Sequence, residues 1–219
     1  KNFLFSMKIK KELYGEESTL YQKKRVELAD FDIDFTDDLG EAKEIYDTEP
    51  HKIILAQLSP VHKEYASVLA KVAKYYDIMD DYDKSIAVFE KSIESSKERY
   101  GENSTEVAKL LSQLADVEIK AGSYKQAEIH INTMLEIVGE KAPEAATSAR
   151  LYAALGEYER AEQAFRKAAK REETAKQDRA FLYVQTGQFA KARELLLEIV
   201  EEINNNSFFS ITYLMHFDS

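Results

Sequence analysis

The feature that most constrains the fold is internal repetition. Residues 12–34, ELYGEESTLYQKKRVELADFDID, match residues 98–120, ERYGENSTEVAKLLSQLADVEIK, at 11 of 23 positions, with an offset of 86 residues. Between the two copies, Ala73 and Tyr82 each precede an identical residue by 42 positions. Repetition with a period of about 20–50 residues is typical of repeat arrays, in which neighbouring units bury a core that no unit can bury alone. We therefore expect a repeat protein.

Three short segments indicate how each unit is built. In each segment a glycine is followed by one variable residue, an aromatic residue, two more variable residues and an alanine. The segments are GSYKQAE (122–128), GEYERAE (156–162) and GQFAKAR (187–193). Each segment is preceded by a small residue: Ala115, Ala149 or Ala180. Each is followed by a large apolar residue: Ile131, Phe165 or Leu196. We interpret the unit as helix, tight turn, helix. Glycine allows the turn, the aromatic residue packs between the helices, and the alanines let the helices approach closely.

With these anchors in place, the sequence resembles the tetratricopeptide repeat (TPR) family. The turn aromatics Tyr82, Tyr124, Tyr158 and Phe189 are separated by 42, 34 and 31 residues. The 42-residue units, clearest in YGENSTEVAKLLSQLADVEIKAGSYKQAE, are similar to the long repeats of kinesin light chain. The resemblance covers about residues 3–203. It implies an all-α fold, a right-handed α-solenoid of antiparallel helix pairs (the TPR superhelix).

The repeat pattern divides the chain into units. The predicted boundaries are 1–15 (second helix of an incomplete repeat), 16–58 (a degenerate acidic repeat), 59–101, 102–142, 143–173 and 174–203 (repeats), and 204–219 (a polar break and an apolar tail). Because a half-unit cannot bury its apolar face alone, we expect the native chain to extend upstream or another chain to cover residues 1–15. The tail either caps the last helix pair or docks on a partner.

Local signals predict several helix ends. Ser59 is expected to cap a helix with Pro60 at its first position, and Asn103 with Glu106 has the spacing of a capping box. Pro143 is expected to open a helix that runs to Leu155. Pro50 should end the second helix of its unit early and leave residues 51–58 as a separate turn.

The acidic stretch 29–41, ADFDIDFTDDLGE, raises the question of a metal site. Its carboxylates occupy the first, third, fifth, ninth and twelfth places of an EF-hand loop, and its alternation also fits an exposed strand. However, residues 30–34 align with residues 116–120 at the end of a first helix. On a helix the carboxylates diverge, and Phe35 stands where an EF-hand needs glycine. We therefore predict a helix and no metal.

The same region carries a marked charge excess. Positions 27 to 49 contain ten acidic residues and only one basic residue, Lys43. They form either a solvated helix surface or a docking patch for a basic partner, as in TPR-type histone chaperones. The candidate patch residues are Asp32, Asp34, Asp37, Asp38 and Glu41.

Composition argues against several functions. The net charge of −10, from 40 acids and 30 bases, disfavours nucleic acid and anionic membranes as partners. Cysteine is absent, the four histidines lack ligand spacing, and no phosphate-binding glycine loop or membrane-length apolar run occurs. We therefore expect no cofactor, no metal and no enzymatic activity, in an intracellular and most simply cytoplasmic protein.

The resemblance implies a concave groove lined by the first helices of the pairs. We call the candidate partner-binding residues the predicted groove residues; they are Asp30, Lys74, Asp77, Lys109, Ser112, Asp116, Lys120, Arg150, Gln177 and Phe181. None of them is asparagine. The grooves of chaperone-clamping TPR proteins and of kinesin light chain use asparagine to hold the bound peptide, so its absence argues against binding of that kind. The predicted function is a non-enzymatic scaffold or adaptor in a larger multiprotein complex, binding an extended or helical segment or a basic surface. The alternatives are an acidic chaperone of basic proteins and a kinesin-light-chain-like cargo-peptide adaptor.

Overall fold

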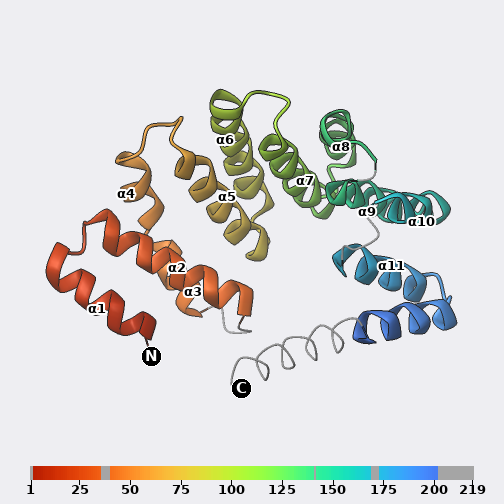
Figure 1. Ribbon diagram of the computed structural model, residues 1–219, viewed down its shortest axis with the longest axis horizontal. Coiled ribbons are helices and arrows are strands. Elements are labelled where there is room, and N and C mark those ends of the chain that lie inside the picture. The colour runs from red at the N-terminus through yellow and green to blue at the C-terminus, as the bar shows by residue number, and fades with distance from the viewer. Residues whose placement is uncertain (1, 36–39, 141, 169–172, 202–219) are drawn as a thin grey trace, which may run out of the picture. The chain divides into compact units, whose positions relative to one another are not determined.

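The computed structural model describes residues 2–35, 40–140, 142–168 and 173–201. All regular elements in these ranges are helices (Figure 1), and they fall into two compact units, Lys1–Ser123 and Tyr124–Ser219. The expected all-α solenoid of helix pairs is confirmed, while the predicted repeat boundaries stay predictions. The tail 204–219 lies outside the described residues.

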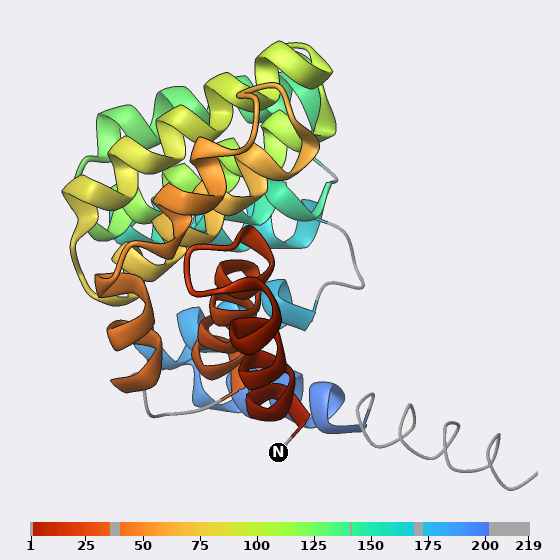
Figure 2. The ribbon, with the colours of Figure 1, turned by 90° about the vertical axis from the view of Figure 1, so that its left-hand side faces the viewer.

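The described residues of unit 1 form seven helices. They are α1 (Asn2–Tyr14), α2 (Thr19–Phe35), α3 (Gly40–Asp47), α4 (Pro50–Ala56), α5 (Lys63–Ile78), α6 (Tyr82–Tyr100) and α7 (Thr105–Lys120). Consecutive helices pack on one another, most extensively α5 on α6 and α6 on α7. Figures 1 and 2 show these three helices side by side.

Small residues allow the close packing in unit 1, as predicted. Ala29, Ala73 and Ala115 are fully buried, one on each of α2, α5 and α7. On α6, the buried Ser85 and Ser92 donate hydrogen bonds of 2.8 Å to the carbonyl oxygens of Ala73 and Ala66. A hydroxyl reaches these carbonyls only where the two helix backbones lie close together. Larger side chains at these contacts would force the helices apart.

The repeated sequence produces the same local structure twice. Gly15 and Gly101, 86 residues apart, both end a helix with positive φ, 80° and 89°. Three residues later, the hydroxyls of Ser18 and Ser104 accept hydrogen bonds from the amides of Tyr21 and Val107, at 3.2 and 3.3 Å. Each serine also donates to the carbonyl of its glycine, at 2.9 and 3.0 Å. The two segments are therefore structural as well as sequence repeats.

Pro50 interrupts the second helix of its repeat (residues 16–58), as predicted. α3 ends at Asp47, Glu49 adopts left-handed backbone angles (φ 50°, ψ 48°), and α4 begins at Pro50. Proline has no amide hydrogen to continue a helix but fits the first position of a new one. α4 remains helical to Ala56 and contacts both α2 and α5.

Unit 2 contains α8 (Tyr124–Val138), the 3₁₀ turn η1 (Pro143–Ala145), α9 (Ala146–Ala154), α10 (Tyr158–Lys167), α11 (Glu173–Gln185) and a helix over residues 189–201. Ala149 and Ala161 are fully buried where α9 meets α10, and Phe165 covers them. Ala180 and Ala192 have the same role where α11 meets the helix over 189–201. The predicted small-residue contacts are therefore present in unit 2 as well.

The turn that follows several first helices has one recurring geometry. Gly122, Gly156 and Gly187 have φ of 76°, 78° and 72°, and the amide after each donates a 2.8 Å hydrogen bond back to the carbonyl five residues earlier. The corresponding turn before α6 has Asp80 (φ 57°), and its following amide closes the same bond at 2.9 Å. This is the left-handed helix ending for which glycine is normally preferred.

Some local predictions were wrong. The cap of α5 is His62, whose Nδ1 accepts from the Glu64 amide, and the cap of α7 is Ser104 instead of Asn103. The segment after Pro143 begins as a 3₁₀ turn before α9. Tyr124, Tyr158 and Phe189 do not pack between helices: they are 36%, 44% and 67% exposed. Each is the first residue of its helix and points outward, while the alanine three residues later is buried.

Candidate partner-binding surface

In unit 1, several predicted groove residues are engaged in contacts between neighbouring first helices. Asp30 on α2 forms an ion pair with Lys71 on α5 and accepts a 2.9 Å hydrogen bond from the Tyr46 hydroxyl. Asp77 on α5 binds Lys120 on α7, with Nζ–O distances of 2.8 and 2.7 Å. These pairs join α2 to α5 and α5 to α7 along one face.

The energetic weight of these ion pairs is modest. Lys120 is 51% exposed and Asp77 16% exposed, and pairs of this kind contribute about 1 kcal/mol or less. The ion pairs matter more for partner binding than for stability. A groove whose charges already pair with one another attracts an external charge less strongly. Lys74 and Lys109 are exposed, Asp116 is half-buried, and Ser112 is buried and offers little surface.

A small cavity of about 200 Å³ lies between α2, α4 and α5. Its apolar floor consists of Val26, Ile54 and Val68, which form one buried cluster. The ion pair between Lys23 and Glu64 crosses its rim. This cavity has room for one small apolar side chain beside the first-helix face of unit 1.

In unit 2, two predicted groove residues meet at a larger pocket. The pocket has a volume of about 330 Å³ and is lined by Arg150, Ala153, Ala154, Phe165, Asp178, Phe181 and Leu182. Arg150 donates from Nη1 to Asp178 at 2.7 Å and from Nη2 to the Thr147 hydroxyl at 2.8 Å. Phe181 is 62% exposed at the edge of the pocket. The pocket therefore has mostly apolar walls and one charge pair that is already satisfied.

Sequence reasoning found Arg150 and Phe181 but missed Asp178 and Leu182. Asp178 lies three residues before Phe181 on the same helix, so helical spacing would have placed it on the same face. Gln177, which was predicted, is exposed and does not line the pocket. Which residue pairs with Arg150 depends on how α9 meets α11, and repeat spacing does not specify that.

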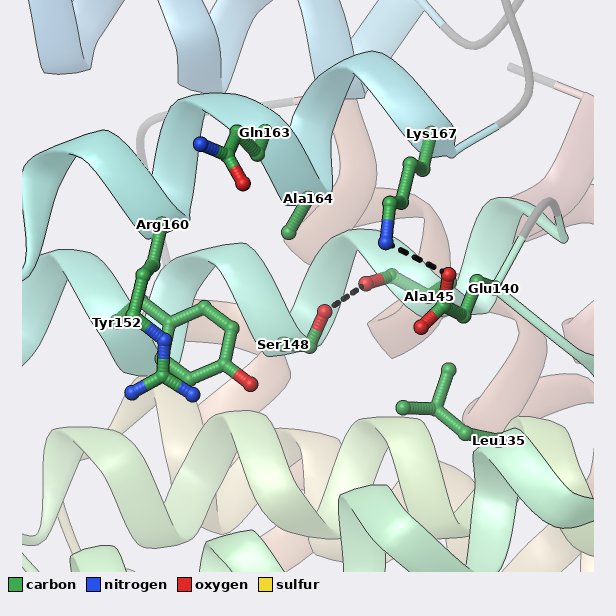
Figure 3. Close-up of a pocket in the computed structure, with 9 residues that line it drawn as sticks. All are labelled: Leu135, Glu140, Ala145, Ser148, Tyr152, Arg160, Gln163, Ala164 and Lys167. Atoms are coloured by element: carbon green, nitrogen blue, oxygen red, sulfur yellow. Dashed lines mark hydrogen bonds and ion pairs between the residues drawn. The ribbon is translucent and has the colours of Figure 1, made fainter.

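A second pocket in unit 2, of about 200 Å³, is formed by α8, η1, α9 and α10 (Figure 3). At one end the guanidinium of Arg160 lies 4.1 Å from the Tyr152 ring centroid. At the other end Lys167 pairs with Glu140 at 2.8 Å. None of its lining residues belongs to the predicted groove residues.

The acidic patch is only partly described. Residues 29–35 belong to α2, so the predicted helix is confirmed there; Asp37 and Asp38 lie outside the described residues. Glu41 is exposed in the first turn of α3. Other acids of the region have internal partners: Asp30 has Lys71, and Glu27 pairs with Lys24 at 2.6 Å. Part of the negative charge of this region is therefore neutralised by ion pairs inside the protein.

Comparison with known proteins defines the family. The tetratricopeptide repeat profile matches residues 61–140, and a second profile of the same repeat matches residues 146–175, so that together they cover half of the chain. The chain belongs to the tetratricopeptide repeat family. Repeats of this family generally bind protein partners, so the chain is a protein-interaction scaffold. A comparison with curated proteins finds no match.

Several solved structures share the fold. BtubC (BKLC) from P. vanneervenii is 17% identical, with 92% of this chain and 88% of that chain covered and a TM-score of 0.58. TPR-like repeats of a putative kinesin light chain from Podosopora anserina are 16% identical, with coverages of 87% and 98% and a TM-score of 0.58. A TPR protein from Parabacteroides merdae is 19% identical, with coverages of 90% and 70% and a TM-score of 0.61. At these identities the likeness shows the fold alone.

No helix within the described ranges combines the length and apolarity needed to span a bilayer.

Proposed function

We propose that the protein is an adaptor within a larger assembly, and that it holds a segment of a partner protein over α9 and α11 of unit 2. The observation that carries this proposal is the exposed Phe181 ring beside a mostly apolar pocket of about 330 Å³. Exposed aromatic residues next to pockets are frequent anchors of protein interfaces. The partner segment inserts an apolar side chain into the pocket and covers Phe181.

The Arg150–Asp178 pair supports a neutral, apolar occupant. Because Asp178 and Thr147 already accept from Arg150, an incoming carboxylate would have to displace them. This differs from a groove that clamps a terminal carboxylate. A kinesin-light-chain-like cargo adaptor remains a form of the same proposal, since such an adaptor also binds an extended peptide.

A photo-crosslinker tests this site. Benzoylphenylalanine at position 181 of the full chain should attach covalently to a defined partner in native extract, and excess unmodified protein should prevent the attachment. The matched control is position 189, where Phe189 is equally exposed, at 67%, but lies outside the pocket. Identical adducts from both positions, or full competition by a Phe181→Ser chain, would count against the proposal.

The alternative, an acidic chaperone of basic proteins, has its own test. Glu41 and Glu44 on α3 are exposed, so they are suitable for charge reversal to lysine. If histones bind with steep salt dependence and the double reversal removes that binding, the acidic patch is functional. If the double reversal leaves histone binding unchanged, the patch is a solvated surface.

A further inference from the structure

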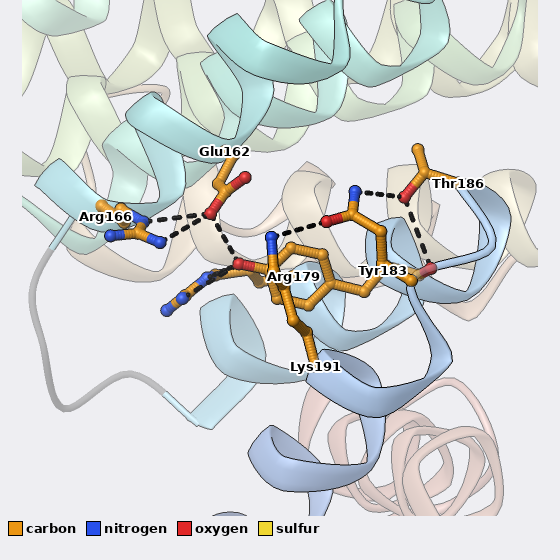
Figure 4. Close-up of polar contacts among 7 residues, drawn as sticks. Glu162, Arg166, Arg179, Tyr183, Thr186 and Lys191 are labelled. Atoms are coloured by element: carbon orange, nitrogen blue, oxygen red, sulfur yellow. Dashed lines mark hydrogen bonds and ion pairs between the residues drawn. The ribbon is translucent and has the colours of Figure 1, made fainter.

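Cationic side chains gather around one buried tyrosine in unit 2 (Figure 4). Tyr183 on α11 is 2% exposed, and its hydroxyl donates a 2.6 Å hydrogen bond to Glu162 on α10. The same hydroxyl accepts from Nε and Nη2 of Arg179, at 3.3 and 3.1 Å. Arg166 pairs with Glu162 at 2.7 Å. Two guanidinium groups therefore converge on one phenol and one carboxylate.

A third cation, Lys191, belongs to the same cluster. Its Nζ lies 5.4 Å from the Tyr183 ring centroid and donates to the Gln188 side-chain oxygen at 2.7 Å. Gln188 in turn donates to the Thr186 hydroxyl at 3.0 Å. We call Glu162, Arg166, Arg179, Tyr183 and Lys191 the Tyr183 cluster. The structure holds Lys191 and Arg179 in place with uncharged oxygens.

The Tyr183 cluster carries an excess of positive charge. Three cations surround the single anion Glu162, whose pKa is lowered by the Tyr183 hydrogen bond and then by Arg166, so it is ionised at neutral pH. Within the described part of the chain, neither Arg179 nor Lys191 has a carboxylate in ion-pair contact. Other cations, such as Lys120 and Arg150, pair directly with aspartate. The net charge of this cluster is about +2 at pH 7.

This arrangement favours a dianion. We propose that Arg166, Arg179 and Lys191 bind the phosphate of a phosphorylated serine or threonine in a partner protein. A phosphoserine carries about −1.5 to −2 charge at neutral pH and matches the excess, whereas a single carboxylate would leave positive charge uncompensated. Guanidinium groups bind phosphate oxygens in a bidentate manner. The site shares no residue with the pocket beside Phe181, so the two proposals stand independently.

Two peptides of the same sequence, one with serine and one with phosphoserine, test the proposal on the ¹⁵N-labelled full chain. The phosphopeptide should cause saturable amide shifts at residues 179, 183 and 191, and the serine peptide should bind at least about tenfold more weakly. Arg179→Gln should weaken phosphopeptide binding by about tenfold or more, since a charge-assisted hydrogen bond is lost. Tyr183→Phe should weaken it less, because it removes only the oxygen that orients Arg179.

Arg160→Gln is the matched control. Arg160 is an exposed arginine of the same unit, stacked on Tyr152 and paired with Glu157, and its removal should leave phosphopeptide affinity unchanged. If Arg179→Gln lowers the melting temperature, Lys191→Gln at its exposed position provides the same measurement. Equal binding of both peptides, equal losses in Arg160→Gln and Arg179→Gln, or binding to phosphatidylserine vesicles without peptide binding would each overturn the proposal.

Discussion

The rings of Tyr46 and Tyr75 stack with their centroids 4.4 Å apart and 16° between their planes, and they join α3 to α5. Both rings are buried, and α3 has only eight residues. A helix of this length has little stability of its own. The stack therefore adds a contact with α5 to the packing of α3 on α2.

Removal of one ring tests the importance of the stack. Tyr46→Ala is expected to lower the free energy of unfolding by about 3–5 kcal/mol, because it deletes a buried aromatic residue and leaves a cavity. Urea denaturation measures this loss. Tyr100→Ala, at a 42% exposed position on α6, should change stability by about 0.5 kcal/mol or less. Similar losses in both variants would mean that the Tyr46 ring makes no special contribution.

Tyr75 also predicts a loss of stability in alkali. Burial, and then the neighbouring Asp47, raise the pKa of Tyr75 to about 12. Because the folded state holds this proton more tightly than the unfolded state, stability is complete below about pH 10 and falls as pH rises towards 12. Unfolding free energies at pH 9 and 11 should show the decrease. Tyr75→Phe should reduce it, and an unchanged decrease would contradict the assignment.

His51 predicts a loss of stability in acid. Its side chain is buried on α4, its Nδ1 meets no hydrogen-bond partner in the described residues, and burial lowers its pKa despite the opposing charge of Glu49. The unfolded state therefore takes up a proton first, and stability decreases as pH falls through about 6.5. Urea titrations at pH 7.5 and 5.0 should show this decrease. His51→Gln should diminish it, and a decrease of the same size in this variant would show that another group is responsible.

Ala115 tests the repeat register. It is fully buried on α7, so Ala115→Trp should destabilise the protein by at least about 1–3 kcal/mol through overpacking. Thermal unfolding followed by circular dichroism measures the effect. Ala87→Trp, at an exposed position of α6, is the control. A melting temperature unchanged by Ala115→Trp would contradict the assigned register.

Gly156 tests the turn between paired helices. Its φ of 78° is unfavourable for other residues, yet no atom lies within 4 Å of an added Cβ. Gly156→Ala should therefore cost about 1–2 kcal/mol from backbone conformation and not from a clash. Asp80 already occupies the equivalent position with φ of 57°. Asp80→Gly should change stability much less, and an equal loss from both substitutions would argue against a shared turn geometry.

The sequence predicted the features that recur. Ala73, Ala115 and Ala149 are buried because each unit needs a small residue where its helices cross, and that need repeats with the sequence. The break before Pro50 followed from the missing amide hydrogen of proline. By contrast, the turn aromatics were misplaced: Tyr124, Tyr158 and Phe189 each begin a helix and face outward instead of packing between helices.

The candidate sites were less predictable, because they depend on contacts between helices of repeats that differ in length. Asp30 and Asp77 were correctly placed on first helices, but their lysine partners lie 41 and 43 residues away. The Tyr183 cluster joins residues of three helices, including Glu162 and Tyr183, 21 positions apart. No repeat position marks these pairs. Only the packing of α10, α11 and the following helix brings them together.

The shared turn also explains how units of different size coexist in one chain. Its closing hydrogen bond is made entirely by backbone atoms, so it does not depend on how far the next helix continues. The helices that follow Asp80, Gly122 and Gly156 have 19, 15 and 10 residues. The same turn therefore accommodates second helices of different length, and a chimera that exchanges the helix after this turn between repeats should keep its closing hydrogen bond.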